Sequence, residues 1–311
     1  MGLGHTFVGI VLLATATSLP ELATGISSIT IAKAPDLAAG AAFGSNIVNL
    51  LIIAIADLLW QRGPVLASIS RGPIVVAFLG AGIIIIASLS TAVHNWTVTL
   101  DSWYISPFSI LLIVFFATAT FIIFRLDTHN KSLASNKNHQ LEGTSKKSAD
   151  PETVRAFGIY LISALCIIGT SIWLSIIGDG LAEALNWEES FVGTQFLAIS
   201  TSLPELATTI AALRLGNPEM AVGNLLGSNL FNMGFILFAD ELAYTDGSLW
   251  ANISTSHIVT GLTAIIMTGI IIITLLLRSK HPRNLSNKWI NPESALLIVI
   301  YVVASIAIFY L

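Results

Sequence analysis

The sequence predicts an all-α polytopic membrane protein of about nine transmembrane helices, arranged as two inverted repeats. Three observations predict this fold class. Of the 311 residues, 54% are hydrophobic and only 10% are charged, whereas soluble domains carry about 25% charged residues. The octapeptide Thr-Ser-Leu-Pro-Glu-Leu-Ala-Thr occurs twice, at 17–24 and at 201–208. Each copy is followed by Gly-Ser-Asn, at 44–46 and at 227–229, so one polar pattern is duplicated within apolar segments.

Apolar runs of membrane-spanning length define the individual helices, since a helix needs about 20 residues to cross the hydrocarbon core. Polar connections separate these runs. The longest connection, 125–154, is rich in Ser, Asn, Lys and Asp and is expected to be a flexible tether. The expected spans are roughly 6–31, 37–59, 73–90, 104–124, 155–178, 191–213, 219–239, 256–277 and 291–311.

The tether divides the chain into two halves that each contain one copy of the repeated pattern. Residues 1–124 form the expected first half, with its repeat at about 6–59. Residues 125–154 are the linker. Residues 155–311 form the expected second half, with its repeat at about 191–239.

Lys and Arg are distributed unevenly between the two sides of the membrane. With this span count, thirteen of the fourteen fall on the side that holds the N-terminus and the linker, and only Lys33 falls on the other. Because cytoplasmic loops carry an excess of Lys and Arg, that side is expected to be the cytoplasm, and the membrane the plasma (inner) membrane. The segment with Glu21 then runs outward and the segment with Glu205 runs inward, so the repeats are antiparallel.

Each octapeptide places a proline and a carboxylate at membrane depth. Proline removes a helical hydrogen bond, and an ionised carboxylate at the bilayer centre costs at least ~2.5–3.5 kcal/mol. The neighbouring residues supply hydroxyl, carbonyl and carboxylate oxygens, which hard cations such as Na⁺ and Ca²⁺ prefer. Glu21 and Glu205 together carry about two negative charges. One Ca²⁺ or two Na⁺ would neutralise them, so these ions are expected to compete for one site.

The Gly-Ser-Asn motifs add a second set of polar side chains. Ser45 and Asn49 are spaced i, i+4 and share a helix face, as do Ser228 and Asn232. Helix packing with interhelical hydrogen bonds is one interpretation of this motif alone. Coupled to the repeated Pro-Glu, the motif favours a cation site, and these four residues are candidate ligands.

At these residues the sequence resembles the sodium/calcium exchanger family of the cation/calcium antiporter superfamily. The matching features are the two Thr-Ser-Leu-Pro-Glu and two Gly-Ser-Asn motifs. The resemblance implies ten helices in two inverted five-helix halves, with clustered Ca²⁺ and Na⁺ sites at the midplane. By motif position it implies Ca²⁺ ligands at Thr17, Glu21, Thr201 and Glu205. It implies Na⁺ ligands at Ser18, Ser45, Ser202 and Ser228 and at the backbone carbonyls of Ala14 and Ala198.

Three features depart from the family pattern. Asn232 stands where members of the family often have Asp, which leaves the cluster without one titratable group. Ala41 occupies the place that Asn224 has in the second repeat, so the packing of the two repeats is expected to differ. The family's first helix has no counterpart before residue 6, which predicts four plus five spans and a truncated or misassigned start.

The function expected from these residues is secondary antiport of Ca²⁺ against Na⁺ by alternating access. The alternatives are a proton/calcium antiporter that uses the same carboxylates, and a non-transporting truncated membrane remnant. An intramembrane enzyme is not expected, because no catalytic dyad or triad accompanies Ser and Glu at comparable depth. The expected partners are the transported ions and the lipid bilayer, with no cofactor and no nucleic acid.

Asp57 and Asp240 occupy equivalent places near the ends of the two Gly-Ser-Asn helices. They are expected either to be helix-end charges at the membrane interface or to form entrance vestibules for cations. His94 and His257 are isolated near span boundaries, and no function is assigned to them.

Overall fold

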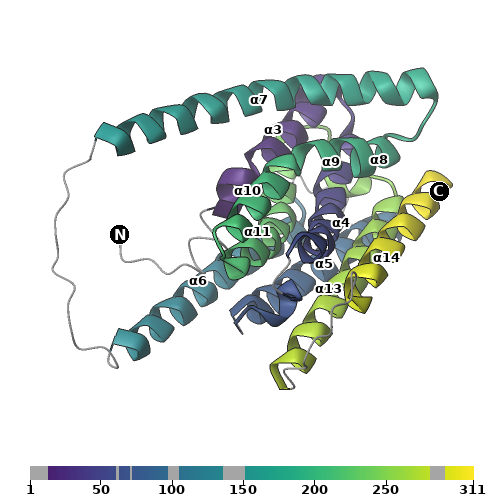
Figure 1. Cartoon of the computed structure of the whole chain (residues 1–311). Coiled ribbons are helices and arrows are strands. Elements are labelled where there is room, and N and C mark those ends of the chain that lie inside the picture. Colours follow the sequence, from purple (N-terminus) through teal and green to yellow (C-terminus); the bar gives the residue numbers. More distant parts are fainter. Residues whose placement is uncertain (1–12, 61–62, 71, 97–104, 136–150, 281–290) are drawn as a thin grey trace.

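The computed structural model describes residues 13–60, 63–70, 72–96, 105–135, 151–280 and 291–311, and within these ranges the protein is a bundle of helices without strands (Figure 1). Eight helical segments there are long and apolar enough to cross a membrane. They match eight of the nine expected spans. The segments are Pro35–Leu59, Gly72–Trp96, Pro107–Leu126, Leu161–Leu185, Glu189–Arg214, Pro218–Ala243, Ser256–Leu277 and Pro292–Phe309.

The expected span at 6–31 is described only in part, because residues 1–12 lie outside the described residues. Its described part is a broken helix. The pieces are α2 (Ala14–Thr17), α3 (Leu19–Ser27) and a π-helical turn, η2 (Ser28–Ala32). The corresponding segment of the second repeat comprises α8 (Glu189–Val192), the π-turn η5 (Gly193–Leu197), α9 (Ala198–Thr201) and α10 (Leu203–Arg214).

The Gly-Ser-Asn helices form the centre of the bundle. In the first repeat this is the continuous helix α4 (Pro35–Leu59). In the second repeat α11 (Pro218–Phe231) is followed by the π-turn η6 (Asn232–Ile236) and by α12 (Leu237–Ala243). Both helices begin with a proline, which is tolerated there because the first turn lacks intrahelical partners for its N–H groups.

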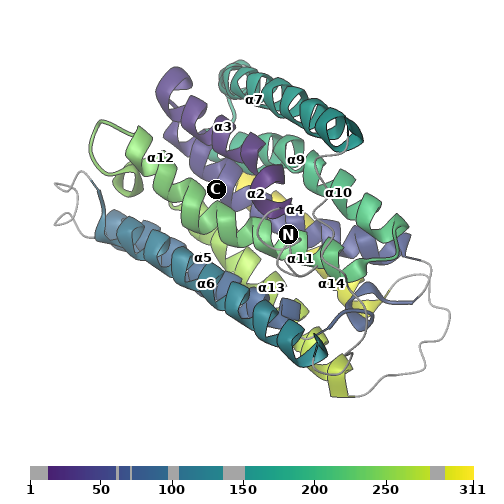
Figure 2. The same ribbon diagram turned by 90° about the vertical axis from the view of Figure 1, so that its left-hand side faces the viewer.

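The remaining helices surround this centre. They are α5 (Gly72–Trp96), α6 (Pro107–Ser135), α7 (Pro151–Leu185), α13 (Ser256–Lys280) and α14 (Pro292–Phe309), with two 3-10 turns, η3 (Val65–Ala67) and η7 (Leu249–Ala251). In both views α6 and α7 lie on opposite sides of the bundle (Figures 1 and 2). Large apolar side chains such as Leu165 on α7 and Val303 on α14 are exposed, as a lipid-facing surface requires.

The boundaries of the linker differ from those expected. The connection was predicted to be a flexible tether over the whole of 125–154, but α6 continues to Ser135 and α7 begins at Pro151. Only 136–150 of this stretch lies outside the described residues. Helix hydrogen bonds extend beyond the apolar run, so composition alone placed the ends of both helices too close to the membrane.

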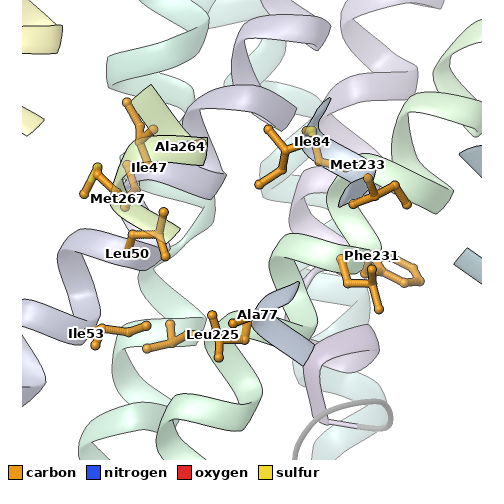
Figure 3. Packing of buried hydrophobic residues seen from close by; sticks show 14 of the residues in the cluster. Ile47, Leu50, Ile53, Ala77, Ile84, Leu225, Phe231, Met233, Ala264 and Met267 are labelled. Atoms are coloured by element: carbon orange, nitrogen blue, oxygen red, sulfur yellow. The ribbon is translucent and has the colours of Figure 1, made fainter. Parts of the chain in front are cut away.

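Close packing of small and apolar residues holds the centre together. Figure 3 shows Ile47 and Leu50 of α4 beside Met267 of α13, all three fully buried. On another face of α4, Gly44 contacts η5: a Cβ at this position would lie 2.5 Å from the carbonyl oxygen of Thr194. Such small-residue contacts stabilise helix pairs in lipid, where no hydrophobic effect drives helices together.

Candidate functional site

The two Pro-Glu motifs break their helices at equivalent residues. Ser18 (φ −88°, ψ 11°) separates α2 from α3, and Ser202 (φ −83°, ψ 5°) separates α9 from α10. The proline that follows each serine by two positions cannot donate a backbone hydrogen bond to the preceding turn. Glu21 and Glu205 therefore lie in the first turn of a new half-helix, where the helix dipole stabilises a negative charge.

The two carboxylates are held by hydroxyls from the opposite repeat. Ser18 Oγ donates a hydrogen bond to Glu205 Oε1 at 3.2 Å, and Ser202 Oγ donates to Glu21 Oε1 at 3.4 Å. Ser228 Oγ also donates to Glu205 Oε1, at 3.3 Å. Both glutamates are at most 1% exposed. Oε2 of each carboxylate receives no hydrogen bond from the described residues, and so can accept a cation.

The motif threonines face the other repeat too, but with different partners. Thr201 Oγ1 lies 3.4 Å from Ser45 Oγ, whereas Thr17 Oγ1 donates to Asn224 Oδ1 at 3.5 Å. Asn224 Nδ2 in turn donates to Thr208 Oγ1 at 3.1 Å. The first repeat has Ala41 in the place of Asn224, so this interaction is made on one side of the site only. The expected difference in packing between the repeats is therefore confirmed at this position.

The threonine hydroxyls also bond to their own helices. Thr17 Oγ1 lies 3.2 Å from the carbonyl oxygen of Ala14, and Thr201 Oγ1 lies 3.3 Å from that of Ala198. The same two carbonyls accept the backbone N–H groups of Ser18 and Ser202. A carbonyl oxygen has two lone pairs, so each would have to exchange one of these bonds to coordinate a cation.

The asparagines of the Gly-Ser-Asn motifs tie α4 to α11. Asn49 Nδ2 donates to Asn229 Oδ1 at 3.0 Å, and Asn229 Nδ2 donates to the carbonyl oxygen of Asn46 at 3.2 Å. Asn49 Oδ1 accepts no hydrogen bond from the described residues. The side-chain amide of Asn232 neither donates nor accepts one among them. The Gly-Ser-Asn segments thus supply both hydrogen bonds between α4 and α11 and amide oxygens that are available to a cation.

All twelve sequence-predicted site residues are buried, and none is more than 6% exposed. Hydrogen bonds join Ser18 to Glu205, Ser202 to Glu21 and Ser45 to Thr201 across the two repeats, whereas Asn49 and Asn232 bond to none of the other predicted site residues. Sequence reasoning did not select Asn224, Thr208 or Asn229 as members of this cluster, although the unmatched Gly-Asn pair was a signal for Asn224. The twelve are Ala14, Thr17, Ser18, Glu21, Ser45, Asn49, Ala198, Thr201, Ser202, Glu205, Ser228 and Asn232.

The donor set is composed of oxygens. Within the described ranges no three His, Cys, Asp or Glu side chains gather in a group that could hold a metal ion by themselves. Two carboxylates with several hydroxyl and amide oxygens remain, and this combination suits hard cations such as Na⁺ and Ca²⁺ better than zinc or copper.

The two equivalent aspartates have different surroundings. Asp57, at 7% exposure, accepts hydrogen bonds from Val65 N at 2.7 Å and from Asn291 Nδ2 and Ser294 Oγ, both at 2.6 Å. It therefore fastens the end of α4 to η3 and to the start of α14. Asp240 is fully buried, and no described residue donates to either of its carboxylate oxygens.

The buried histidines belong to polar contacts at the helix ends. His257 Nε2 on α13 lies 2.8 Å from Asp36 Oδ1 at the start of α4. His94 Nε2 lies 3.1 Å from Ser106 Oγ, and the backbone N–H of Ser106 donates to Glu241 at 3.0 Å. The His257 contact connects α13 to α4, and the His94 contact connects the end of α5 to the residue before α6, which gives both histidines a structural role that their spacing did not reveal.

Comparison with known protein families gives a match over both halves of the chain. The family described as "Sodium/calcium exchanger protein" matches residues 1–125 and 155–310. The segment between the two matches falls within the expected linker.

Individual relatives are similar to this chain in sequence, and solved structures are similar to it in fold. The chain is 27% identical to the sodium/calcium exchanger MaX1 of Methanosarcina acetivorans, over 100% of this chain and 91% of that protein. It is 26% identical to the inner membrane protein YrbG of Escherichia coli, over 76% and 69%. A structure of the sodium-calcium exchanger NCX_Mj soaked with 10 mM Na⁺ superposes with a TM-score of 0.63 at 19% identity, over 98% of this chain and 87% of that one. The structure of native YfkE gives 0.62 at 17% identity, over 98% and 90%.

Proposed function

Because this chain belongs to the sodium/calcium exchanger protein family, we propose that it exchanges Ca²⁺ for Na⁺ across a membrane by alternating access. Membership of this family indicates a cation/calcium antiporter, and the apolar helices indicate an integral, multi-pass membrane protein. The choice of Na⁺ as the coupling ion is the proposal. The relative in Methanosarcina acetivorans that carries the name sodium/calcium exchanger supports this choice over the full length of the chain.

The observation that carries the proposal is the reciprocal pairing of Glu21 and Glu205 with serines of the opposite repeat. Each carboxylate keeps one oxygen without a hydrogen bond from the described residues, in a cluster of hydroxyl and amide oxygens. Two negative charges match one Ca²⁺ or two Na⁺. The same site can therefore bind either load, which is the requirement for exchange rather than co-transport.

The buried charge explains why transport is coupled. Two ionised carboxylates without counter-ions are costly to enclose, by several kcal/mol per ion after relaxation. A protein with bound Ca²⁺ or Na⁺ avoids this penalty. Only ion-loaded forms are therefore expected to switch between the conformation that opens the site to one side of the membrane and the conformation that opens it to the other. Ser18 and Ser202 hold the carboxylate oxygens in place, and the broken half-helices are the elements expected to move.

The proposed residue roles are those that the family resemblance implies by motif position. Glu21, Glu205, Thr17 and Thr201 are the proposed Ca²⁺ ligands. Ser18, Ser45, Ser202 and Ser228, with the carbonyls of Ala14 and Ala198, are the proposed additional Na⁺ ligands, and Asn49 and Asn232 offer amide oxygens. The proposed orientation places the N-terminus and the 125–154 connection in the cytoplasm, since Lys and Arg concentrate there.

The test is uptake of ⁴⁵Ca²⁺ into proteoliposomes loaded with Na⁺ and diluted into Na⁺-free buffer at equal internal and external pH. We expect uptake that depends on internal Na⁺ and disappears when choline replaces it. Uptake that follows an imposed pH gradient without Na⁺ would instead assign proton/calcium antiport to the same carboxylates. A folded protein that neither transports nor binds these cations would be a non-transporting remnant, and would overturn the proposal.

A further inference from the structure

Asp240 on α12 is a buried carboxylate that the exchange mechanism above does not use. It is 0% exposed, and neither of its oxygens receives a hydrogen bond from the described residues. Its neighbour Glu241 accepts three, from Ser106 N, Ser248 Oγ and Trp250 Nε1. Its counterpart Asp57 also accepts three. An ionised carboxylate buried without a partner is strongly destabilising, so either a proton or a cation must neutralise Asp240.

The carboxylate lies directly against α3. A Cβ at Gly25 would be 2.5 Å from Asp240 Oδ1 and 2.8 Å from Oδ2, so only glycine allows this approach. Gly25 is four residues after Glu21, which places the contact one turn along the same helix face. Figure 2 shows α12 beside α3. Asp240 is thus one helical turn away from the Glu21 end of the cation site.

A second unpartnered oxygen follows on the same side. Ser28 is three residues after Gly25, is fully buried, and its hydroxyl has no hydrogen-bond partner among the described residues. Residues at i and i+3 are neighbours on a helix surface. Ser28 therefore lies on the same face of this segment as Gly25, the residue that Asp240 contacts, and η2 also packs on α12.

A pocket of about 200 Å³ lies at the end of the bundle that holds Lys33. Its lining includes Ile29, next to Ser28, and Ala243, three residues after Asp240. Lys33 and Asp246 contribute charges of opposite sign. Partial burial and, secondarily, the charge of Asp246 raise the pKa of the Tyr244 hydroxyl, so this phenol is neutral. Asp240 itself does not line the pocket; it lies about one helical turn before Ala243 on α12.

We propose that Asp240 and Ser28 form a binding site for one Na⁺ on the path between this pocket and the Glu21/Glu205 cluster. A single carboxylate matches the charge of a monovalent cation, whereas Ca²⁺ would leave a net positive charge in apolar surroundings. Both oxygens of Asp57 already accept hydrogen bonds, so this position of the first repeat lacks the two unbonded oxygens that Asp240 offers. The site acts on one side of the membrane only, the side that the Lys and Arg distribution predicts to be external. This inference builds on the proposed function in taking Na⁺ as the coupling ion.

The first test measures Na⁺ binding without transport, by ²³Na NMR titration in detergent. In the Glu21→Gln/Glu205→Gln variant, which lacks both central carboxylates, we expect one Na⁺ site to persist. Adding Asp240→Asn should abolish it, whereas adding Asp246→Asn, an exposed carboxylate of the same pocket, should leave it. No Na⁺ binding in the double variant, or binding that survives Asp240→Asn, would overturn the proposal, because Asp240 would then be protonated and only pack against α3.

The second test measures Na⁺-driven Ca²⁺ flux with Na⁺ varied on one side at a time. Asp240→Asn should raise the half-saturating Na⁺ concentration on the Lys33 side by about fivefold or more, the effect of losing an interaction of about 1 kcal/mol. Ser28→Ala, a milder change, should shift it in the same direction. Equal shifts on both sides would contradict the one-sided site. If the wild-type protein shows no Na⁺-driven flux, the proposed function fails, and the NMR titration still decides whether Asp240 binds Na⁺.

Discussion

Ser18 Oγ donates a hydrogen bond to Oε1 of Glu205, 187 residues away in the other repeat, at 3.2 Å. Ser202 makes the reciprocal bond to Glu21. Each repeat thus orients the carboxylate of the other, and neither repeat contains a complete site. A relative movement of the two repeats necessarily changes the coordination of both carboxylates, which links ion occupancy to conformation.

Removing one central charge should stop exchange. Glu21→Gln or Glu205→Gln keeps the size of the side chain but leaves one negative charge for Ca²⁺, so Na⁺-dependent Ca²⁺ uptake should fall by about 100-fold or more, as expected when a buried charge loses its partner. Elution as a single species on size-exclusion chromatography checks that each variant is folded. Glu183→Gln, an exposed carboxylate on α7, is the matched control and should transport normally. Normal transport by both site variants would refute the site assignment.

The serines at the helix breaks should set affinity. Ser18→Ala and Ser202→Ala each remove a hydrogen bond to a carboxylate, an interaction of about 1.5–3 kcal/mol. The half-saturating Ca²⁺ concentration should therefore rise by roughly tenfold or more in either variant. Ser200→Ala is the control, because Ser200 is exposed and bonds only to the carbonyl of Phe196 in its own helix. Equal, small effects of all three changes would show that the crosswise bonds do not control affinity.

Restoring a carboxylate at Asn232 should shift ion preference. Neither polar atom of this side chain has a hydrogen-bond partner among the described residues, so Asn232→Asp adds charge without breaking a contact. Three negative charges exceed what one Ca²⁺ neutralises, and we expect tighter Ca²⁺ binding together with a new dependence of the Ca²⁺ affinity on pH. Isothermal titration with Ca²⁺ at two pH values measures both effects. A variant with unchanged affinity would place Asn232 outside the coordination sphere.

The contact of α4 with η5 should be sensitive to a single methyl group. Gly44→Ala places a Cβ 2.5 Å from the carbonyl oxygen of Thr194, so the helices must separate and the melting temperature should fall, with overpacking costs of about 1–3 kcal/mol. Gly169→Ala on α7 is the control, since nothing lies within 4 Å of its added Cβ. Alanine there should leave the melting temperature unchanged or raise it. A thermal-shift assay in detergent distinguishes these outcomes.

Asp57 should contribute to stability rather than to transport. Asp57→Asn weakens its acceptance of three hydrogen bonds that connect α4 to η3 and α14. The free energy of unfolding should fall by about 2 kcal/mol or more, because bonds to a charged group are worth about 1.5–3 kcal/mol each. The half-saturating Na⁺ concentration of the folded variant should stay the same on both sides. A change in Na⁺ dependence with normal stability would mean that Asp57 contacts the transported ion.

Local sequence patterns predicted most of the fold. Apolar length predicted eight described spans, and proline predicted the loss of a helical hydrogen bond in each motif, where the structure breaks the helix at Ser18 and Ser202. Both effects act within a few residues of the chain. The extension of α6 and α7 beyond the apolar runs was not predicted. Helix hydrogen bonding continues into polar sequence, and composition carries little information on where it ends.

The hydrogen-bond partners of the site residues could not be predicted from local patterns. The repeated motifs indicated which residues would gather, but Thr17 bonds to Asn224 while Thr201 faces Ser45. This difference depends on Ala41 having no side-chain amide, and on how α2 and α11 meet in three dimensions. Two identical octapeptides thus acquire different surroundings.

The sequence alone determined a membrane protein with two copies of one oxygen-rich cation motif, because hydropathy and duplication are properties of the chain itself. The tertiary structure decided which repeat supplies the hydroxyl for each carboxylate. It also decided that Asp57 accepts three hydrogen bonds while Asp240, its equivalent, is buried against Gly25 with no donor among the described residues. Hydrogen-bond partners and burial depend on residues distant in sequence, so equivalent positions in a repeat can differ in chemistry once the chain has folded.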